Sequence, residues 1–429
     1  MLHQKPSVSS LLPTLGLLVL SAGLGAIFSL IGRWQDLTYS VPEFIAFTLV
    51  TGVLYASGVY LVEHFSLGPS ALLVIVLGAL FFRLSLLPCQ PAVSNDVYRY
   101  QWEGRVERLH INPYIAYPAM PGLSGIEDRG RPLQTGRNVS TLYPPLSEIS
   151  FSWVRTAAAY KRLYTGFDLA SIGVLMALLV VLKQPLHRVL TYAWNPCVII
   201  SFAMCGHHDS LAIFTLLAAI LFLTLRRPAL SLTFLALSVI SKFFSLLLFP
   251  TILRRTRPAY AALFVAVVGI SYLPFLSAGT RLFNGLSDYA ASWENNDSLF
   301  RLIRLAGNSK PQAELVAGVF ILILVVFAWK RRLEPVSASL LLLSGLLFLS
   351  PNAFPWYFTW IIPFLCFYPI APLLLLSITS VLGYAPVVAY AVGGPYRDSP
   401  LILLLEYGPV LIWLLYQSWR VSQPSPAVG

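Results

Sequence analysis

Long apolar runs recur along almost the whole of this chain, and they limit the folds open to it more than any other feature. Of its 429 residues, 57% are hydrophobic and 11% are charged, which is far from the composition of soluble globular domains. A helix needs about 20 predominantly apolar residues to cross a bilayer. We therefore expect an all-α protein, a polytopic transmembrane helix bundle, and not a water-soluble enzyme.

The runs that are free or nearly free of charge predict about 12 spans. The first run could pass for a signal peptide, but its length and the many runs after it favour a retained span. The predicted spans are Leu11–Gly32, Phe44–Val62, Phe65–Phe82, Leu169–Leu182, Val189–Gly206, Ser210–Leu225, Pro258–Gly279, Leu315–Trp329, Pro335–Ser350, Ala353–Pro369, Ile370–Gly394 and Leu401–Trp419.

One further apolar stretch, Pro228–Leu253, is interrupted by Lys242. Arg226 and Arg227 precede this stretch, and a second basic cluster begins at Arg254. Because short basic segments stay on the cytoplasmic side, a single crossing would violate that rule. We therefore predict a re-entrant helix pair that starts and ends on the cytoplasmic side, with its tip near Lys242 buried in protein and not exposed to lipid.

The net charge of +11 comes from 29 basic and 18 acidic side chains, and membrane topology explains it better than nucleic-acid binding. Basic residues gather in the segments assigned to the cytoplasm, where both chain ends are placed. Nearly all carboxylates fall on the outer side, chiefly in two polar segments, 88–166 and 280–314. We expect one integral membrane domain over residues 1–422, a disordered tail at 423–429 and polar chemistry collected on the outer face of the membrane.

The residues best suited to chemistry follow the third run, in the string Ser94-Asn95-Asp96-Val97-Tyr98-Arg99-Tyr100-Gln101-Trp102-Glu103-Gly104-Arg105-Val106. Asn95 or Asp96 is placed to cap a helix. Asp96, Glu103 and either Arg99 or Tyr100 would then share one helical face. Taken alone, the string fits an amphipathic helix at the membrane surface equally well.

Further motifs favour a catalytic role for this string. They are Ile111-Asn112-Pro113-Tyr114, Tyr143-Pro144-Pro145-Leu146, Trp194-Asn195-Pro196, Gly206-His207-His208-Asp209 and Pro355-Trp356-Tyr357. Together with the string around Asp96, they resemble the bacterial GT-C type glycosyltransferases, and within these the polyprenol-phosphate-mannose-dependent mannosyltransferases. The resemblance covers residues 88–150, 190–210, 241–250 and 351–360, and the other runs match only as apolar helices.

The resemblance implies a GT-C-like fold and an inverting transfer of a hexose, with mannose expected, from a polyprenyl-phosphate donor to a glycan or glycolipid acceptor. It also implies an active site on the outer, periplasmic face of a bacterial inner membrane. It makes Asp96 the catalytic base that takes the proton of the acceptor hydroxyl. In that family a second acid often stands just before the aspartate. Here Asn95 occupies that position, so Asp96 is the single candidate.

The charges that develop on the sugar and on the leaving phosphate both need partners. For binding the donor phosphate and sugar, the sequence offers Arg99, Arg105, His207, His208, Asp209 and Lys242. The residues expected to line the substrate are Tyr98, Glu103, Asn112, Tyr143, Trp356 and Tyr357. Simpler roles stay open, since Asp209 can cap a helix, Lys242 can snorkel to the surface, and aromatic side chains are typical of membrane interfaces.

No metal and no cofactor are expected. Adjacent histidines on a helix do not aim at one ion, no third ligand has suitable spacing, and the four cysteines form no metal-binding pattern. Two other functions stay open. A lipid or sugar-lipid transporter, or flippase, would use the stretch around Lys242 as a gate, although the sequence shows no duplication. A non-enzymatic membrane subunit would tolerate the joint replacement of Asp96 and Arg99.

Overall fold

The chain folds as a bundle of helices in the computed structural model, which describes residues 8–34, 40–91, 93–126, 136–391 and 393–422. Eight helical stretches in these residues are long and apolar enough to cross a membrane. They are α1 (Val8–Gly32), α2 (Val41–His64), α3 (Pro69–Leu86), α6 (Ala157–Val181), α12 (Tyr260–Tyr272) with η5 (Leu273–Phe283) and α13 (Asn284–Ser292), α15 (Lys310–Lys330), α18 (Ala371–Thr379) with η7 (Ser380–Tyr384) and α19 (Pro386–Ala391), and α20 (Pro400–Ser422).

Four of the predicted spans are shorter or interrupted helices. These are α9 (Asp209–Thr224), α16 (Pro335–Leu349), the series η2 (Leu186–Val189), α7 (Leu190–Ala193), α8 (Pro196–Ile199) and η3 (Ile200–Met204), and the pair η6 (Pro355–Trp360) and α17 (Ile362–Leu365). Proline fits the first turn of a helix but not its interior, and Pro196, Pro355 and Pro363 each lie in the first turn of one of these short helices. The structure therefore shows a polytopic bundle with eight long apolar helices, fewer than the expected number of spans.

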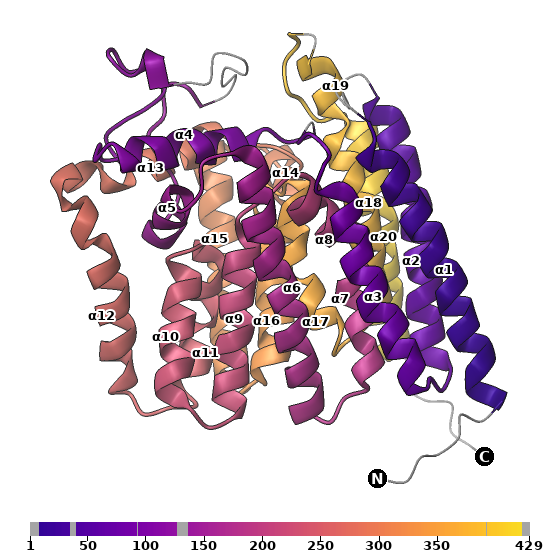
Figure 1. The fold of residues 1–429 in the computed structure, drawn as a ribbon. Helices are drawn as coiled ribbons and strands as arrows, with labels where there is room; N and C mark the ends of the chain where they lie inside the picture. The colour runs from indigo at the N-terminus through magenta and orange to yellow at the C-terminus, as the bar shows by residue number, and fades with distance from the viewer. Residues whose placement is uncertain (1–7, 35–39, 92, 127–135, 392, 423–429) are drawn as a thin grey trace.

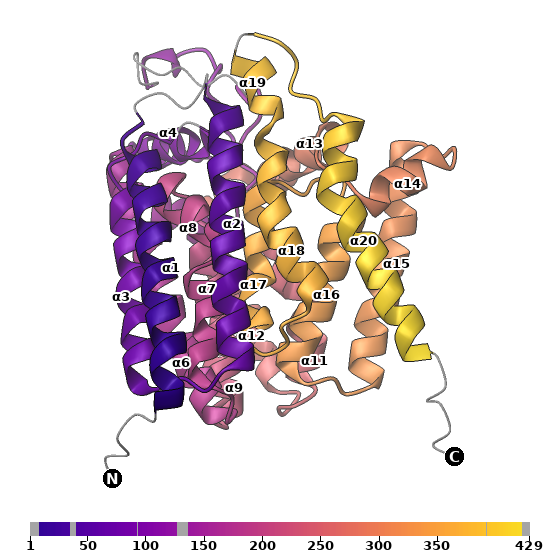
Figure 2. The ribbon, with the colours of Figure 1, turned by 90° about the vertical axis from the view of Figure 1, so that its right-hand side faces the viewer.

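The first and last described helices, α1 and α20, begin and end respectively at one end of the bundle, which we call the terminal end (Figures 1 and 2). α4 (Asp96–Arg108) lies across the opposite end, which we call the α4 end (Figures 1 and 2). The short helices α13 and α14 (Leu299–Leu305) also lie toward the α4 end. The helices α4, α13 and α14 thus lie at the end of the bundle opposite the start of α1 and the end of α20.

Residues 228–253 form a helical hairpin that has the geometry expected of the predicted re-entrant pair. α10 (Pro228–Val239) rises from the terminal end, and η4 (Phe243–Leu248) with α11 (Phe249–Leu253) returns to it (Figure 1). The helix breaks at Lys242, whose backbone is extended, with φ −158° and ψ 132°. α10 packs against α9 and α12, and η4 packs against α16, so protein surrounds the hairpin tip.

The first polar segment, predicted to extend to residue 166, ends earlier because α6 begins at Ala157. Its first turn is capped by the Thr156 hydroxyl, which accepts a hydrogen bond from the Ala159 N–H at 3.2 Å. The charge of Lys161 interrupts the apolar pattern, so the predicted span began after it. In the fold, the Lys161 ammonium is buried and donates to the carbonyl oxygens of Leu86 and Leu87 at 3.0 and 2.9 Å. The predicted disordered tail, 423–429, lies outside the described residues.

Candidate functional site

Asp96 is the first residue of α4, and its side chain remains 31% exposed at the α4 end of the bundle. Asn95 stands at the N-cap position, but its side chain makes no capping hydrogen bond. The Ser94 hydroxyl instead accepts from the Asp96 N–H at 3.4 Å. The start of α4 thus matches the prediction, whereas the side chain expected to cap it is not used.

The fold brings His207, which is distant in the sequence, close to Asp96. Its Nδ1 lies 3.6 Å from Asp96 Oδ2 and 3.4 Å from the Tyr100 hydroxyl. The Trp356 ring stacks on the imidazole, with the ring centroids 4.0 Å apart. Gly206, at φ 72°, provides the turn that presents His207. Motifs that are distant in sequence therefore meet at Asp96.

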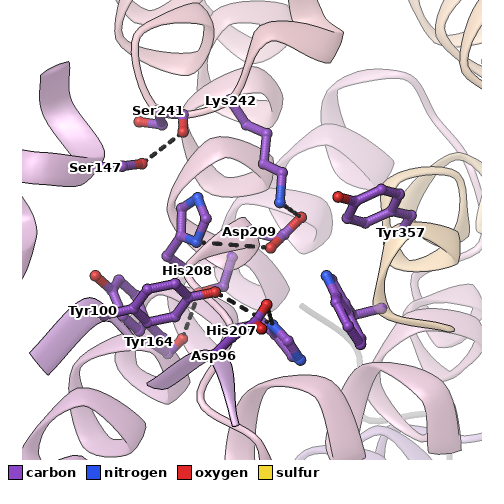
Figure 3. A network of polar contacts seen from close by, with 12 residues as sticks. Asp96, Tyr100, Ser147, Tyr164, His207, His208, Asp209, Ser241, Lys242 and Tyr357 are labelled. Atoms are coloured by element: carbon purple, nitrogen blue, oxygen red, sulfur yellow. Dashed lines mark hydrogen bonds and ion pairs between the residues drawn. The ribbon is translucent and has the colours of Figure 1, made fainter. Parts of the chain in front are cut away.

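Lys242 and the buried Asp209 form an ion pair next to these groups. Lys242 Nζ lies 2.9 Å from Asp209 Oδ1, and the indole Nε1 of Trp360 donates to the same oxygen at 2.7 Å. Asp209 lies between the Lys242 ammonium and the Asp96–His207 contact (Figure 3). The hairpin tip therefore brings a cation into the cluster at the α4 end, and Lys242 does not snorkel to the terminal end.

Aromatic edges enclose His208 on several sides. The ring centroids of Tyr100, Tyr143, Phe151 and Tyr164 lie 5.1, 4.9, 5.5 and 6.3 Å from that of the imidazole. His208 is fully buried, and its imidazole interacts with the backbone of Ser241. The four rings therefore hold this imidazole in a largely apolar enclosure beside Asp209.

Further rings line the side of the cluster that carries Lys242. The ammonium lies 4.7 Å from the centroid of the Tyr357 ring and 5.6 Å from that of Trp360, within the range of cation–π attraction. The Tyr357 hydroxyl is 3.2 Å from that of Tyr289 in α13. Such a combination of apolar faces with a few convergent polar groups is typical of ligand-binding sites.

The hairpin tip is attached to α5 (Pro145–Ser152), which begins within the Tyr143-Pro144-Pro145-Leu146 motif. The Ser147 hydroxyl donates to the Ser241 carbonyl oxygen at 2.6 Å (Figure 3), and the Leu146 N–H donates to the Ile240 carbonyl oxygen at 2.8 Å. These bonds satisfy carbonyls at the end of α10 that the helix itself leaves free. The motif therefore helps to hold Lys242 where it meets Asp209.

The two arginines predicted to bind phosphate lie elsewhere. Arg99 donates to Glu103 Oε1 at 2.7 Å and to the carbonyl oxygens of Gly136 and Val139, both at 2.8 Å, so its guanidinium is already engaged. Arg105 is exposed and donates to the Ile126 carbonyl oxygen. The described contacts therefore connect neither arginine to the Asp209–Lys242 pair.

Three predicted lining residues have structural contacts instead. Glu103 is buried and ion-paired with Arg99, and Tyr98 packs between two small apolar clusters on either side of α4. The Asn112 amide donates to the Phe275 carbonyl oxygen at 2.9 Å and to the Ser277 hydroxyl at 2.8 Å. Of the predicted lining residues, Tyr143, Trp356 and Tyr357 are the ones that border the cluster.

Sequence reasoning missed several residues of the site. Trp360 follows Tyr357 by three positions, the spacing that places two side chains on one face of a 3₁₀ helix such as η6, and the two rings stack with their centroids 4.4 Å apart. Ser147, Ser241 and Tyr164 have no such signal, because small polar and aromatic side chains are common throughout the chain. Their roles depend on contacts between segments that only the folded chain reveals.

Burial governs the proton affinity of the carboxyl groups at the α4 end. It raises the pKa of Asp96 to about 6, with Lys242 opposing the shift and Asp209 and Glu103 adding to it. Burial also raises the pKa of Glu103 and of Glu148, although the Arg99 guanidinium opposes the shift at Glu103. Asp96 is therefore mainly ionised at neutral pH and has a pKa suited to a general base.

The helices α4 and α5 approach each other closely at Gly104. A Cβ at Gly104 would overlap the Phe151 carbonyl oxygen and lie 2.7 Å from the Tyr160 hydroxyl. Gly104→Ala should therefore destabilise the protein by about 1–3 kcal/mol, measured by thermal or denaturant unfolding in detergent. Gly166→Ala is the matched control, because a Cβ at this exposed helical position in α6 meets nothing within 4 Å. Equal stabilities of the two variants would contradict this packing argument.

In the part of the chain that the structure describes, no group of three or more His, Cys, Asp or Glu side chains is placed to hold a metal ion. Comparison with known families and with curated proteins gave no matching family model and no matching protein. The function must therefore be argued from the residues of this site and their geometry.

Proposed function

We propose that this chain is an integral-membrane glycosyltransferase of the GT-C type, which moves a hexose, with mannose as the first candidate, from a polyprenyl-phosphate donor to an acceptor at the α4 end. The observation that carries this proposal is one polar cluster in which Asp96, His207, Asp209 and Lys242 meet beside aromatic rings. The motifs that carry the resemblance to that family supply every one of these residues except Lys242.

Asp96 serves as the base in this proposal. A sugar or lipid hydroxyl is a poor nucleophile, and a carboxylate within hydrogen-bond reach takes its proton while the new bond forms at the anomeric carbon. The carboxylate is partly exposed, so an acceptor can reach it from the α4 end. Attack opposite the leaving phosphate inverts the anomeric centre.

Lys242 is the proposed partner of the donor phosphate, since Arg99 and Arg105 are engaged elsewhere. His207, His208 and Asp209 supply polar atoms for the sugar, and two of these atoms have no hydrogen-bond partner among the described residues: His207 Nε2 and Asp209 Oδ2. Trp356, Tyr357 and Tyr143 supply apolar ring faces for the sugar and for the start of the lipid chain.

The proposal includes an orientation in the membrane. Basic residues flank the hairpin at the terminal end, at Arg226, Arg227 and Arg254, which favours that end for the cytoplasm. The α4 end then faces outward, toward the periplasm of a bacterial cell. The short helices α9 and α16 cross within the bundle, where surrounding protein replaces lipid, and this arrangement is compatible with about twelve crossings.

The direct test uses the purified full chain in liposomes, with synthetic polyprenyl-phosphate hexoses as donors and octyl mannoside and an envelope lipid extract as acceptors. We expect a mannosylated product and free polyprenyl phosphate, detected by mass spectrometry. Liposomes without protein are the control. Translocation of the donor without any product would favour a flippase, and the absence of transfer from every donor would refute the proposal.

A further inference from the structure

The Lys242–Asp209 pair has two features that a purely structural ion pair does not need. Asp209 Oδ1 accepts from both Lys242 and Trp360, whereas Asp209 Oδ2 has no hydrogen-bond partner among the described residues. The side chain of Lys242 keeps 14% of its surface exposed, whereas that of Asp209 is fully buried. The carboxylate of the pair is thus incompletely satisfied.

Contacts other than the one with Asp209 also fix the position of Lys242. The backbone of the tip is bonded to α5 through Ser147 and Leu146, and the rings of Tyr357 and Trp360 flank the ammonium. None of these contacts neutralises the positive charge. If Asp209 gave up the ammonium, the tip would keep its place and the charge would face an incoming anion.

We propose that Asp209 is a resident counter-ion for Lys242, and that the phosphate of a prenyl phosphoester displaces it on binding. This inference rests on the proposed function and deepens it by naming the group that the phosphate replaces. The exchange involves no covalent step. A phosphoester oxygen takes the place of Asp209 Oδ1 at the ammonium, where charge-assisted hydrogen bonds are strong.

The exchange changes what Asp209 can do. Its carboxylate keeps the Trp360 indole as a donor and gains a free acceptor site. His208 Nδ1 lies 4.0 Å from Asp209 Oδ2, too far for a hydrogen bond, so a sugar hydroxyl is suited to bond both groups. Phosphate binding therefore prepares the adjacent sugar site.

The exchange also predicts an order among ligands. A phosphomonoester carries more negative charge at neutral pH than a phosphodiester does, so polyprenyl phosphate, the product, should bind more tightly than the donor. Free phosphate shares the charge but lacks the apolar chain, and a neutral prenol has the chain without the charge.

Binding of geranyl phosphate to the purified full chain tests the exchange, with geraniol and inorganic phosphate as separate arms. Lys242→Met should weaken geranyl phosphate binding at least about tenfold, the size of one charge-assisted hydrogen bond. Lys242→Arg should keep the affinity within a few-fold. Asp209→Asn removes the competing carboxylate and should strengthen binding about tenfold. Tighter binding of geranyl phosphate than of inorganic phosphate assigns the site to a lipid phosphate.

The pair Lys310 and Glu314, whose charged atoms lie 3.5 Å apart at the start of α15, provides matched controls. Lys310→Met and Glu314→Gln should leave the affinity unchanged. Unchanged affinity in both Lys242→Met and Asp209→Asn would overturn the exchange. If Asp209→Asn fails to fold, the contrast between Lys242→Met and Lys242→Arg decides.

The two proposals can fail separately. If the protein transfers sugar but its affinity for phosphate does not change when residue 242 is substituted, the exchange is overturned and the transferase function stays in place. Charge-dependent phosphate binding without transfer from any polyprenyl-phosphate hexose would support the exchange and refute the transferase.

Discussion

Replacing Asp96 with asparagine should lower the rate of sugar transfer by a factor of about 10²–10⁴, the usual contribution of a general base. Asparagine keeps the size and polarity of the side chain but cannot take a proton. The contact with His207 at 3.6 Å is long, so the fold should not depend on it. We therefore expect a large loss of turnover with nearly unchanged stability and donor binding, measured with the liposome transfer assay.

Asp288→Asn is the matched control, because Asp288 is an exposed carboxylate in α13, toward the same end of the bundle. It should leave transfer unchanged. A pH profile adds a second readout, since the pKa of Asp96 lies at about 6. The base works only when ionised, so the wild-type rate should rise with pH through this value and level off above it. Substantial turnover by Asp96→Asn would remove this residue from the role of base.

Much of the fold could be predicted, because the requirement to bury backbone polar groups in a membrane allows few solutions. The runs that became α1, α16 and α20 were predicted to within a few residues of their observed ends. The runs around Pro196 and Pro355 could not be resolved in the same way. Composition shows that these runs are apolar, whereas the residues at which their helices break depend on proline and on packing against neighbouring helices.

The motifs that form the candidate site could be predicted from the sequence, but the contacts between them could not. Asp96, His207 and Asp209 belong to motifs that were singled out in advance, and the fold brings them together with Lys242. Arg99 was expected at the phosphate because guanidinium groups suit phosphates. It is instead bound by Glu103 and by backbone carbonyls near residue 136, and no sequence pattern shows that a loop supplies those acceptors.

The largest expected loss of stability lies away from the site, at the ion pair between Arg83 of α3 and Asp168 of α6. Both side chains are fully buried, with Nε to Oδ2 at 2.5 Å and Nη2 to Oδ1 at 3.1 Å. The remaining guanidinium nitrogen donates to the carbonyl oxygens of Ala79 and Ala193. Removing one partner leaves an uncompensated charge inside the bundle, so Asp168→Ala should cost about 3–5 kcal/mol in the free energy of unfolding.

Two comparisons separate the effect of the charge from that of the packing. For every variant, the free energy of unfolding is measured with denaturant in detergent. The double variant Arg83→Met with Asp168→Leu removes both charges and fills the space, so it should be more stable than Asp168→Ala. Glu334→Gln should cost no more than about 1 kcal/mol in the free energy of unfolding. The Glu334 side chain is 72% exposed, and its ion pair with Arg255 lies at the surface. A loss at Asp168 no larger than that at Glu334 would mean that water reaches the buried pair. In that case α3 and α6 would be held together by their apolar contacts and not by this ion pair.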